Sequence, residues 1–440
     1  SGGAVAGRGR WEPGRVSRDS RQKVMHEDLM DQGVAEENLA RARAAVKRNR
    51  GAAGIDRMTV DELEVHWQRH GAKMRAKLVA GRWTPSPVRR VEIPKPNGGT
   101  RQLGIPTVMD RVVQQALLQV LQPIFDPRFS ESSYGFRPRR SAHDAVRAAQ
   151  GYVREGKDWV VDIDIAQFFD HVNHDILMQR IAEVIRDKKV LRLIGRYLRA
   201  GVMAAGVVVR SEEGTPQGGP LSPLLANLYL DALDRELETR GLSFCRYADD
   251  CNVYVSSEAA AKRVLAGIGD WIERHLRLRV NRAKSGAGRP WERKFLGFRI
   301  NRKGQREVAP QSVQRCKQKV REIWRSCRSV TSRALRDEWR RYVVGWWGYY
   351  RLAQERRNVF RLEGWIRRHM RKCFWLRWHG VRGRQRALRR LGVGERLIAL
   401  VPTRRGAWFM SSNALLHKGL SNAILKRYGL VVPSNLAACG

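Results

Sequence analysis

The sequence predicts an α+β protein whose C-terminal part is all-helical and strongly basic. Segments rich in β-branched residues alternate with amphipathic helical segments over roughly the first 304 residues. Beyond that point, apolar residues recur at helical spacing only. Residues 301–440 contain 33 Lys and Arg against 7 Asp and Glu, a net of +26 out of +41 for the chain. Such a surplus favours a polyanionic partner over a merely soluble basic face.

The bulk composition is that of a globular protein with two or three domains. The chain has 440 residues, of which 42% are hydrophobic. Its six cysteines form no C-x-x-C pair, which argues against a zinc ribbon or a redox motif and indicates reduced thiols in the cytosol. The sequence has no run of 18 apolar residues and no signal peptide, so we expect a cytoplasmic protein without a membrane partner.

The N-terminal part is predicted to be a basic arm over 1–35 followed by helices. Residues 36–50 have helical periodicity, and "TVDE" at 59–62 has the capping-box pattern that starts a second helix. Residues 88–105 predict a hairpin, because alternating residues flank the turn sequence "PNGG". The stretch 110–121 is an amphipathic helix.

The central part alternates strands with helices. Ser141 in "SAHD" is the N-cap of a predicted helix. After it we expect a strand at 159–170 that runs into a turn, helices over 175–200, 222–240 and 258–275, a Gly- and Pro-rich loop at 213–223, a hairpin over 243–256 and a strand at 295–300.

The C-terminal part is predicted to hold three consecutive helices and a small basic tail. One apolar stripe in the second helix joins Leu335, Trp339, Tyr342, Val343, Trp346 and Tyr350. The resulting domain limits are 1–80 for an N-terminal extension, 81–304 for the α+β body, 305–380 for the helical module and 381–440 for the tail.

Acidic residues stand out in this basic chain at "DID" and "YADD". In an extended strand Asp162 and Asp164 share one face, and Asp249 lies at the tip of a predicted hairpin. If the two strands are neighbours, Asp164 and Asp249 converge and require a cation. Carboxylate oxygens suit Mg²⁺, and two such ions serve nucleotidyl transfer. The alternative is a solvated Asp-Asp turn without chemistry.

The order of seven motifs resembles that of a reverse transcriptase, specifically the class C-like reverse transcriptase/maturases encoded by bacterial group II introns. These motifs are "IPKPNGGTRQLGIPTVMDRVVQQAL", "SYGFRPRRSAHDA", "VVDIDIAQFFDHVNHDIL", "GTPQGGPLSPLLANLYLDALD", "RYADDC", "VNRAKS" and "KFLGFRI". The resemblance implies a right-hand polymerase fold with fingers, a palm, an all-α thumb and a small basic DNA-binding domain. It also implies a bacterial, nucleoid-associated protein.

The resemblance implies a catalytic triad of Asp164, Asp249 and Asp250. Asp164 and Asp249 would hold the metals with the Ile165 carbonyl, and Asp250 would shape the site. Asp162 lies outside the motif and is expected to pair with a basic neighbour.

Further residues would bind the incoming nucleotide and the primer. Phe169 would exclude a ribose 2′-OH, while one of the phenylalanines in "FF" belongs to the core. The nucleotide-binding residues implied by the resemblance are Arg89, Lys95, Arg101, Ile165, Phe169, Pro216, Gln217, Ala248 and Lys284, and those of the primer grip are Phe295, Leu296 and Gly297. Read without the family, Arg89, Lys95 and Arg101 equally suit a solvated basic face.

Aromatic residues in "GWWGYY" at 345–350 allow two interpretations. They could stack on bases, or they could pack in the core, which the helical stripe through Trp346 and Tyr350 favours. His171 and His174 have a metal-like spacing, but no third ligand is evident, so zinc is not expected.

The function implied by the resemblance is RNA-directed DNA polymerisation with Mg²⁺, for which Mn²⁺ can substitute. The partners would be an RNA template, and also a DNA template, a DNA primer, dNTPs and the group II intron RNA that the protein helps to splice. Two alternatives stay open: a splicing-only maturase, and a host-recruited reverse transcriptase in DNA repair or defence. The sequence leaves the oligomeric state open.

Overall fold

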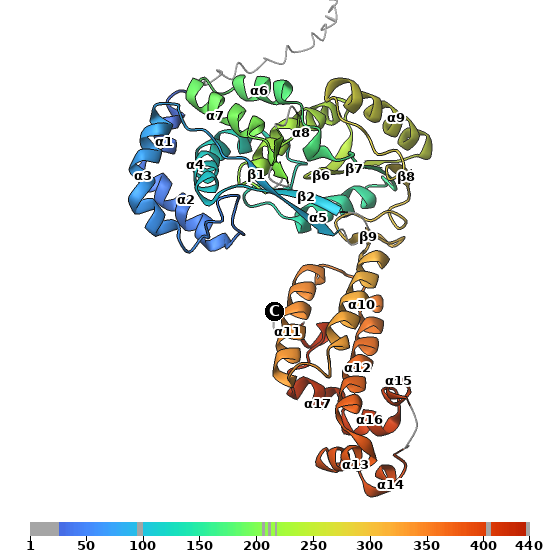
Figure 1. Cartoon of the computed structure of the whole chain (residues 1–440). Coiled ribbons are helices and arrows are strands. Elements are labelled where there is room, and N and C mark those ends of the chain that lie inside the picture. Colours follow the sequence, from blue (N-terminus) through green and yellow to red (C-terminus); the bar gives the residue numbers. More distant parts are fainter. Residues whose placement is uncertain are drawn as a thin grey trace, which may run out of the picture. The chain divides into compact units, whose positions relative to one another are not determined.

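The computed structural model describes residues 26–94, 100–204, 207–209, 213–215, 218–401 and 406–436 (Figure 1). The chain forms two compact units. The first comprises Ser1–Leu121 with His174–Leu221, and the second comprises Gln122–Asn173 with Ser222–Gly440. The predicted domain limits follow one another along the chain, whereas the compact units interleave. Residues far apart in sequence therefore share a unit.

The first unit combines helices with a four-stranded sheet. Its helices are α1 (Leu29–Gly33), α2 (Glu36–Asn49), α3 (Leu63–Val79), α4 (Val108–Phe125), α6 (His174–Ala182) and α7 (Lys188–Arg199), and its strands are β1 (Val88–Pro94), β2 (Thr100–Ile105), β4 (Val202–Ala204) and β5 (Val207–Val209). The strand order is β2-β1-β4-β5. The predicted hairpin of β1 and β2 is present, with Ile93 opposite Arg101.

Two predictions for this unit need correction. Thr59 does bind the Glu62 carboxylate through its backbone and hydroxyl groups, but α3 begins only at Leu63. The contact therefore closes a turn before the helix. The helical stretch predicted over 175–200 is two helices, because the Asp187 carboxylate accepts hydrogen bonds from the backbone N–H groups of Lys189 and Val190 and starts α7 there.

The second unit contains the sheet that carries the acidic motifs. Its strands are β3 (Trp159–Ile163), β6 (Ser243–Tyr247), β7 (Asp250–Val255) and β8 (Gly286–Gly288), in the order β6-β7-β3-β8 with antiparallel neighbours. A separate two-stranded sheet pairs β9 (Phe298–Ile300) with β10 (Arg306–Val308). The predicted strand at 295–300 is thus shorter, because Leu296 and Gly297 have positive φ angles and form a turn.

Helices cover both faces of this acidic sheet. The helices are α5 (Ala142–Arg154), α8 (Ser222–Thr239) and α9 (Glu258–His275). Ser141 caps α5 in a capping box with Asp144, as predicted. Val160 packs with α5 residues in one core cluster, whereas Val161 points the other way and is also fully buried. Burial on both faces explains the continuous apolar runs of β3 and β7.

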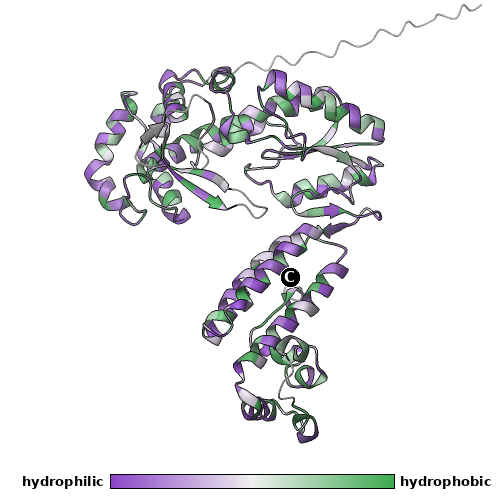
Figure 2. Cartoon of the chain, turned by 45° about the vertical axis from the view of Figure 1, so that its right-hand side comes forward, coloured by the Kyte–Doolittle hydropathy of each residue, from purple (hydrophilic) through white to green (hydrophobic). Residues whose placement is uncertain are grey.

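The C-terminal helices share one core with the tail. The long helices are α10 (Pro310–Arg325), α11 (Ser332–Tyr350) and α12 (Arg357–Arg377), and the short ones are α13 (Gly380–Arg390), α14 (Glu395–Ile398), α15 (Ala407–Met410), α16 (Ala414–Gly419), α17 (Asn422–Arg427) and α18 (Pro433–Leu436). One apolar cluster runs from Cys316 to Val432. Figure 2 shows apolar and polar residues alternating along these helices, as amphipathic helices require.

The most deeply buried face of α11 includes Trp347, which lies outside the predicted apolar stripe. Trp339, Val343, Trp347 and Tyr350 are buried, whereas Trp346 is only half-buried. Tyr350 is buried as predicted. Trp346 packs against both core clusters but is only partly buried, and Trp347 is the more deeply buried of the two tryptophans. Successive steps of four residues place Trp347, not Trp346, below Trp339 and Val343.

Two further predictions concern thiols and membranes. Cys245, Cys251, Cys316, Cys327 and Cys373 are buried free thiols. Across the described ranges, none of the helices has the length and apolarity needed to cross a bilayer.

Candidate active site

The pairing of β3 with β7 brings the two acidic motifs together. In the antiparallel register Ile163 lies opposite Cys251 and Asp162 opposite Asn252. Asp164 follows Ile163 directly, so the same register places it level with Asp250. Asp249 occupies the two-residue turn between β6 and β7, where Tyr247 pairs with Asp250. The convergence that "DID" and "YADD" predicted is therefore present in the second unit.

The turn that carries Asp249 has a constrained backbone. Ala248 has a φ of 57°, in the left-handed region that a tight hairpin turn requires. Gly135 lies against it, because a Cβ atom at Gly135 would come within 2.3 Å of the Ala248 nitrogen. The backbone N–H of Tyr134 donates to the Arg246 carbonyl, and the N–H of Arg246 donates to the Ser132 carbonyl. The segment 132–135 thus packs against the hairpin turn at Ala248 and stabilises it.

A buried ion pair fixes the same turn from within the core. Arg246 on β6 and Asp234 on α8 are both fully buried, and the guanidinium donates two hydrogen bonds of 2.5 and 2.6 Å to the carboxylate. It also donates to the Ser133 hydroxyl, the Asn227 amide oxygen and, at 2.9 Å, the carbonyl of Ala248. Sequence reasoning missed this network, although an Arg directly before "YADD" in an apolar strand was a visible signal.

The carboxylates at this end of the sheet repel one another. Asp250 is exposed on one side. Burial of its carboxyl by the surrounding protein nevertheless raises its pKa to about 6, and repulsion by Asp249, Asp162 and Asp164 adds to this rise. The pKa of Asp162 is also raised to about 6, chiefly by burial, while Arg293 and Lys294 oppose the rise. Arg293 and Lys294 are therefore the basic groups that act on Asp162, and its pairing with a basic neighbour stays a prediction.

The chemistry of this donor set fits a divalent cation. In the described part of the chain, no three His, Cys, Asp or Glu side chains gather closely enough to hold an ion alone. Magnesium in phosphoryl-transfer sites, however, takes only one or two carboxylates and completes its shell with water and substrate phosphates. Repulsion among the carboxylates around Asp250, which Lys294 only partly offsets, would be relieved by such an ion.

The two phenylalanines after the acidic strand differ in depth. Both lie in a 3-10 turn, Phe168–Asp170, with ring centroids 5.1 Å apart. Phe168 is 2% exposed and packs against Tyr229, whereas Phe169 is 8% exposed. Phe168 is thus the deeper core residue, which leaves Phe169 as the candidate to face a nucleotide.

The "NRAKS" turn is tied to the backbone of Asp164. The N–H of Asn281 donates to the Asp164 carbonyl at 2.8 Å, and the N–H of Asp164 donates to the Ser285 hydroxyl at 2.9 Å. Lys284 lies between them and is exposed. Ile165, two residues beyond the end of β3, forms an isolated β-bridge with Val280 and is buried.

The segment predicted to be the primer grip is a turn held by hydrogen bonds from the C-terminal helices. Leu296 and Gly297 have φ angles of 51° and 83°. The hydroxyl of Tyr349 donates to the Leu296 carbonyl, and that of Ser312 donates to the Gly297 carbonyl. Phe295 is buried in the core cluster that joins α5 to α11. Helices α10 and α11 therefore determine the position of this turn.

Two further nucleotide-binding candidates, Arg89 and Arg101, lie in the first unit. The Arg89 guanidinium donates to the Ala53 carbonyl at 3.0 Å, so it also supports the fold locally. Arg101 lies on β2 opposite Ile93. Lys95, Pro216 and Gln217 fall outside the described residues.

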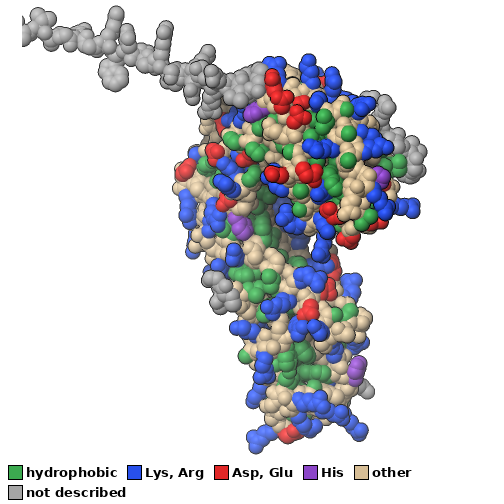
Figure 3. Space-filling view, turned by 90° about the vertical axis from the view of Figure 1, so that its left-hand side faces the viewer, with side chains coloured by type: hydrophobic (Ala, Val, Ile, Leu, Met, Phe, Trp, Pro, Cys, Tyr) green, Lys and Arg blue, Asp and Glu red, His purple; other side chains and the backbone are tan. Residues whose placement is uncertain are grey.

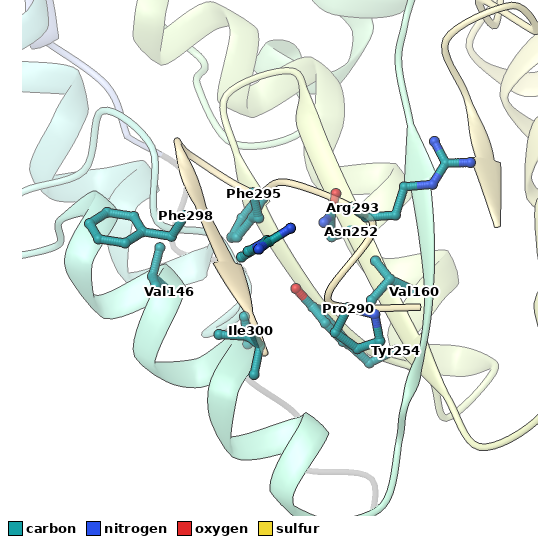
Figure 4. Close-up of a pocket in the computed structure, with 11 residues that line it drawn as sticks. Val146, Val160, Asn252, Tyr254, Pro290, Arg293, Phe295, Phe298 and Ile300 are labelled. Carbon is teal, nitrogen blue, oxygen red and sulfur yellow. The ribbon is translucent and has the colours of Figure 1, made fainter. Parts of the chain in front are cut away.

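A cavity beside the acidic sheet is too small for a substrate. Its volume is about 10 Å³, no more than one water molecule occupies. Val160, Asn252 and Tyr254 of the sheet, Val146 of α5 and Phe298 of β9 surround it, together with Arg293 (Figure 4). Val160 and Asn252 share their sheet face with Asp162, which explains how Arg293 acts on that carboxylate.

Comparisons with known proteins agree with this geometry. Residues 93–300 match the family described as reverse transcriptase (RNA-dependent DNA polymerase), and residues 313–392 match the group II intron maturase-specific domain. Protein YkfC of Escherichia coli (strain K12) is 32% identical over 309 residues, which cover 61% of this chain and 81% of YkfC. The chain belongs to the reverse transcriptase family. The predicted α+β right-hand polymerase fold and RNA-directed DNA polymerase class are thereby confirmed.

This reverse transcriptase has further relatives among intron-encoded proteins. Group II intron-encoded protein LtrA of Lactococcus lactis subsp. cremoris is 42% identical over 166 residues, which cover 37% of this chain and 27% of LtrA. The chain thus spans most of YkfC but about a quarter of LtrA. A chain of the solved Cas6-RT-Cas1–Cas2 complex is 25% identical over 56% of this chain and 26% of that chain, with a TM-score of 0.37.

Proposed function

We propose that this reverse transcriptase extends a DNA primer on RNA, and also on DNA, by two-metal nucleotidyl transfer. The register that brings Asp164 level with Asp250, with Asp249 at the adjacent turn, is the observation that carries the proposal. Magnesium, or manganese in its place, would supply Lewis-acid stabilisation of the attacking and leaving oxygens. Asp164, Asp249 and the Ile165 carbonyl would hold it.

The other residues have positioning roles in the proposed reaction. Asp250 keeps negative charge at the site, and the small side chain of Ala248 leaves room for the primer end. Lys95 and Arg101 neutralise the triphosphate, and Lys284 provides an exposed cation near the pyrophosphate. The remaining roles are those of Arg89, Pro216 and Gln217 around the nucleotide and of Phe295, Leu296 and Gly297 at the primer.

Incorporation of labelled dNTP on primed RNA and on primed DNA tests the polymerase proposal. Asp249→Ala should lower the rate at least about a hundredfold, because metal-held charge stabilisation is worth several kcal/mol. Asp270→Ala, on an exposed face of α9, is the matched control and should keep full activity. A wild-type protein that incorporates nothing with Mg²⁺ or Mn²⁺ would refute the proposal.

Discrimination against ribonucleotides tests the proposed role of Phe169. Phe169→Ala should admit rNTPs, because the ring no longer excludes the 2′-OH. Phe168→Ala, its matched control, should lower the melting temperature without changing sugar selectivity, since Phe168 packs in the core. Unchanged selectivity in Phe169→Ala would show that another residue is the gate.

We further propose that the protein binds a group II intron RNA and assists its splicing. The match of residues 313–392 to the maturase-specific domain and the cationic surface of the helices support this role. A search for intron RNA structure around the reading frame would identify the substrate. A splicing assay with that RNA should then show protein-dependent splicing that Asp249→Ala retains.

A further inference from the structure

A cluster of aromatic rings and cations joins three C-terminal helices. The rings of Trp365 and His369 on α12 lie 4.3 Å apart, and those of His369 and Trp408 on α15 lie 4.9 Å apart. The guanidinium of Arg368 lies 4.1 Å from the centre of the Trp408 ring. On the other side, Arg321 lies 5.3 Å from the Trp365 ring. We call these five residues the ring cluster.

Core packing explains only part of the ring cluster. Trp365 is half-buried against the apolar core of the helices. Trp408, in contrast, is 38% exposed, although Met410 two residues later is fully buried. Arg368 holds this short helix in place by donating to the Trp408 carbonyl and the Ser411 hydroxyl. Several contacts thus hold the large ring of Trp408 at the surface.

Among the described residues, no carboxylate forms an ion pair with the cations of the ring cluster. Burial lowers the pKa of His369 to about 4, and the charges of Lys372, Arg321 and Arg368 add to this shift. Its imidazole is therefore neutral at physiological pH and adds a flat, uncharged ring. Within the described residues, no ion pair joins Lys317, Arg321, Arg368 or Lys372 to a carboxylate. Figure 3 shows Lys and Arg far outnumbering Asp and Glu on one face of these helices.

We infer that the ring cluster binds unpaired nucleotides of single-stranded RNA. Repelling cations without carboxylates favour an anion such as phosphate, and exposed flat rings favour the face of a base. A double helix hides its base faces, so the rings would be unused on a duplex. Helix α12 and most of α10 lie within the region that matches the maturase-specific domain, whereas Trp408 lies beyond it. The choice of RNA as the strand therefore rests on the proposed binding of intron RNA, and the inference does not depend on polymerase chemistry.

Fluorescence anisotropy with a short labelled oligoadenylate tests this site in the full-length chain. A hairpin primer–template is added to occupy the polymerase site, and no dNTP is present, so the result is independent of the catalytic proposal. Trp408→Ala should weaken oligoadenylate binding at least about fivefold, the lower end for loss of one base stack. Trp408→Phe should retain most of the affinity. Phe360→Ala, which removes an aromatic ring that is 56% exposed at the start of α12, is the matched control and should bind normally.

The salt dependence of oligoadenylate binding distinguishes the contribution of base stacking from that of phosphate contacts. Arg321→Gln should reduce the slope of log affinity against log salt by about 0.7, as expected for one phosphate contact on a single strand. Trp408→Ala should leave that slope unchanged. Melting temperatures of all variants show whether the fold is intact.

Photo-crosslinking of the wild-type chain gives a second, mutation-free measurement. Bromouridine-substituted RNA should crosslink to Trp408 or His369. Absence of crosslinks on α12 and α15, or a Trp408→Ala variant with wild-type affinity, would overturn the inference. An equal loss of affinity for single-stranded DNA or for duplex RNA would overturn the assignment to single-stranded RNA.

Discussion

Two residues that flank one hairpin turn, Arg246 on β6 and Asp250 on β7, differ in how their charges are compensated. Arg246 is fully buried, and its guanidinium donates to the Asp234 carboxylate and to three neutral oxygens. Asp250, four residues later, lies among carboxylates that raise its pKa. The first charge is matched within the protein and holds the turn in place. Around the second, repulsion by neighbouring carboxylates outweighs the attraction of Lys294. Where the fold leaves like charges together, we expect a binding site.

Breaking the matched pair should have the largest effect on stability. Asp234→Ala should destabilise the protein by about 3–5 kcal/mol, because Arg246 is left buried and uncompensated. Denaturant unfolding measures this change. The double variant Asp234→Leu/Arg246→Met should recover stability but not polymerase activity, because the Ala248 carbonyl still lacks its donor. A double variant with full activity would show that Arg246 does not position the turn.

The second-largest effect on stability is expected from a substitution that crowds the turn at Ala248. Gly135→Ala should cost about 1–3 kcal/mol, because the new methyl group overlaps the Ala248 nitrogen and displaces the turn. We expect kcat to fall while the KM for primer–template changes little. Gly151→Ala, on α5 with open space around the new Cβ atom, is the matched control and should be neutral or slightly stabilising.

Disturbing the primer-grip turn should have a smaller effect on stability. Gly297→Ala places a methyl group 2.6 Å from the Tyr350 hydroxyl at a φ of 83°, and we expect a cost of about 1–2 kcal/mol. The KM for primer–template should rise. Tyr350→Phe in the same chain should relieve part of the clash and lower that KM again. If the second change has no effect, strain in the backbone alone accounts for the loss.

Replacing the Asp250 carboxylate by a neutral amide should slightly stabilise the protein while lowering its polymerase activity. The pKa of Asp250 is raised to about 6 in the folded state, so the folded chain holds this proton more tightly than the unfolded chain. Its contribution to stability is therefore present at low pH and is lost as the pH rises through about 4 to 6. Without divalent cations, Asp250→Asn should raise stability at neutral pH by only about 0.5 kcal/mol, because solvent screens this exposed group. Thermal unfolding in EDTA across this pH range measures the difference, and a destabilised variant would contradict the expected repulsion.

Local patterns in the sequence were sufficient for several elements. Ser141 and Asp144 form a capping box within four residues of chain, and the alternation in 88–105 specified a hairpin. The acidic turn was also readable, because a two-residue loop between apolar strands leaves Asp249 at its tip. The order of the motifs carried the family, which the comparisons confirm. In each case the deciding interactions lie close together in the chain.

What only the tertiary structure decided involves partners far apart in sequence. Gly135 contacts Ala248 across more than a hundred residues, and the Arg246 guanidinium donates to the Ser133 hydroxyl across a similar separation. The ring cluster likewise draws its rings and cations from α10, α12 and α15. Periodicity shows which face of a helix is apolar, but not which residue of another element packs against it. The sequence by itself therefore determined the chemistry of the acidic site, while long-range packing determined what holds that site in place and where cations remain unmatched.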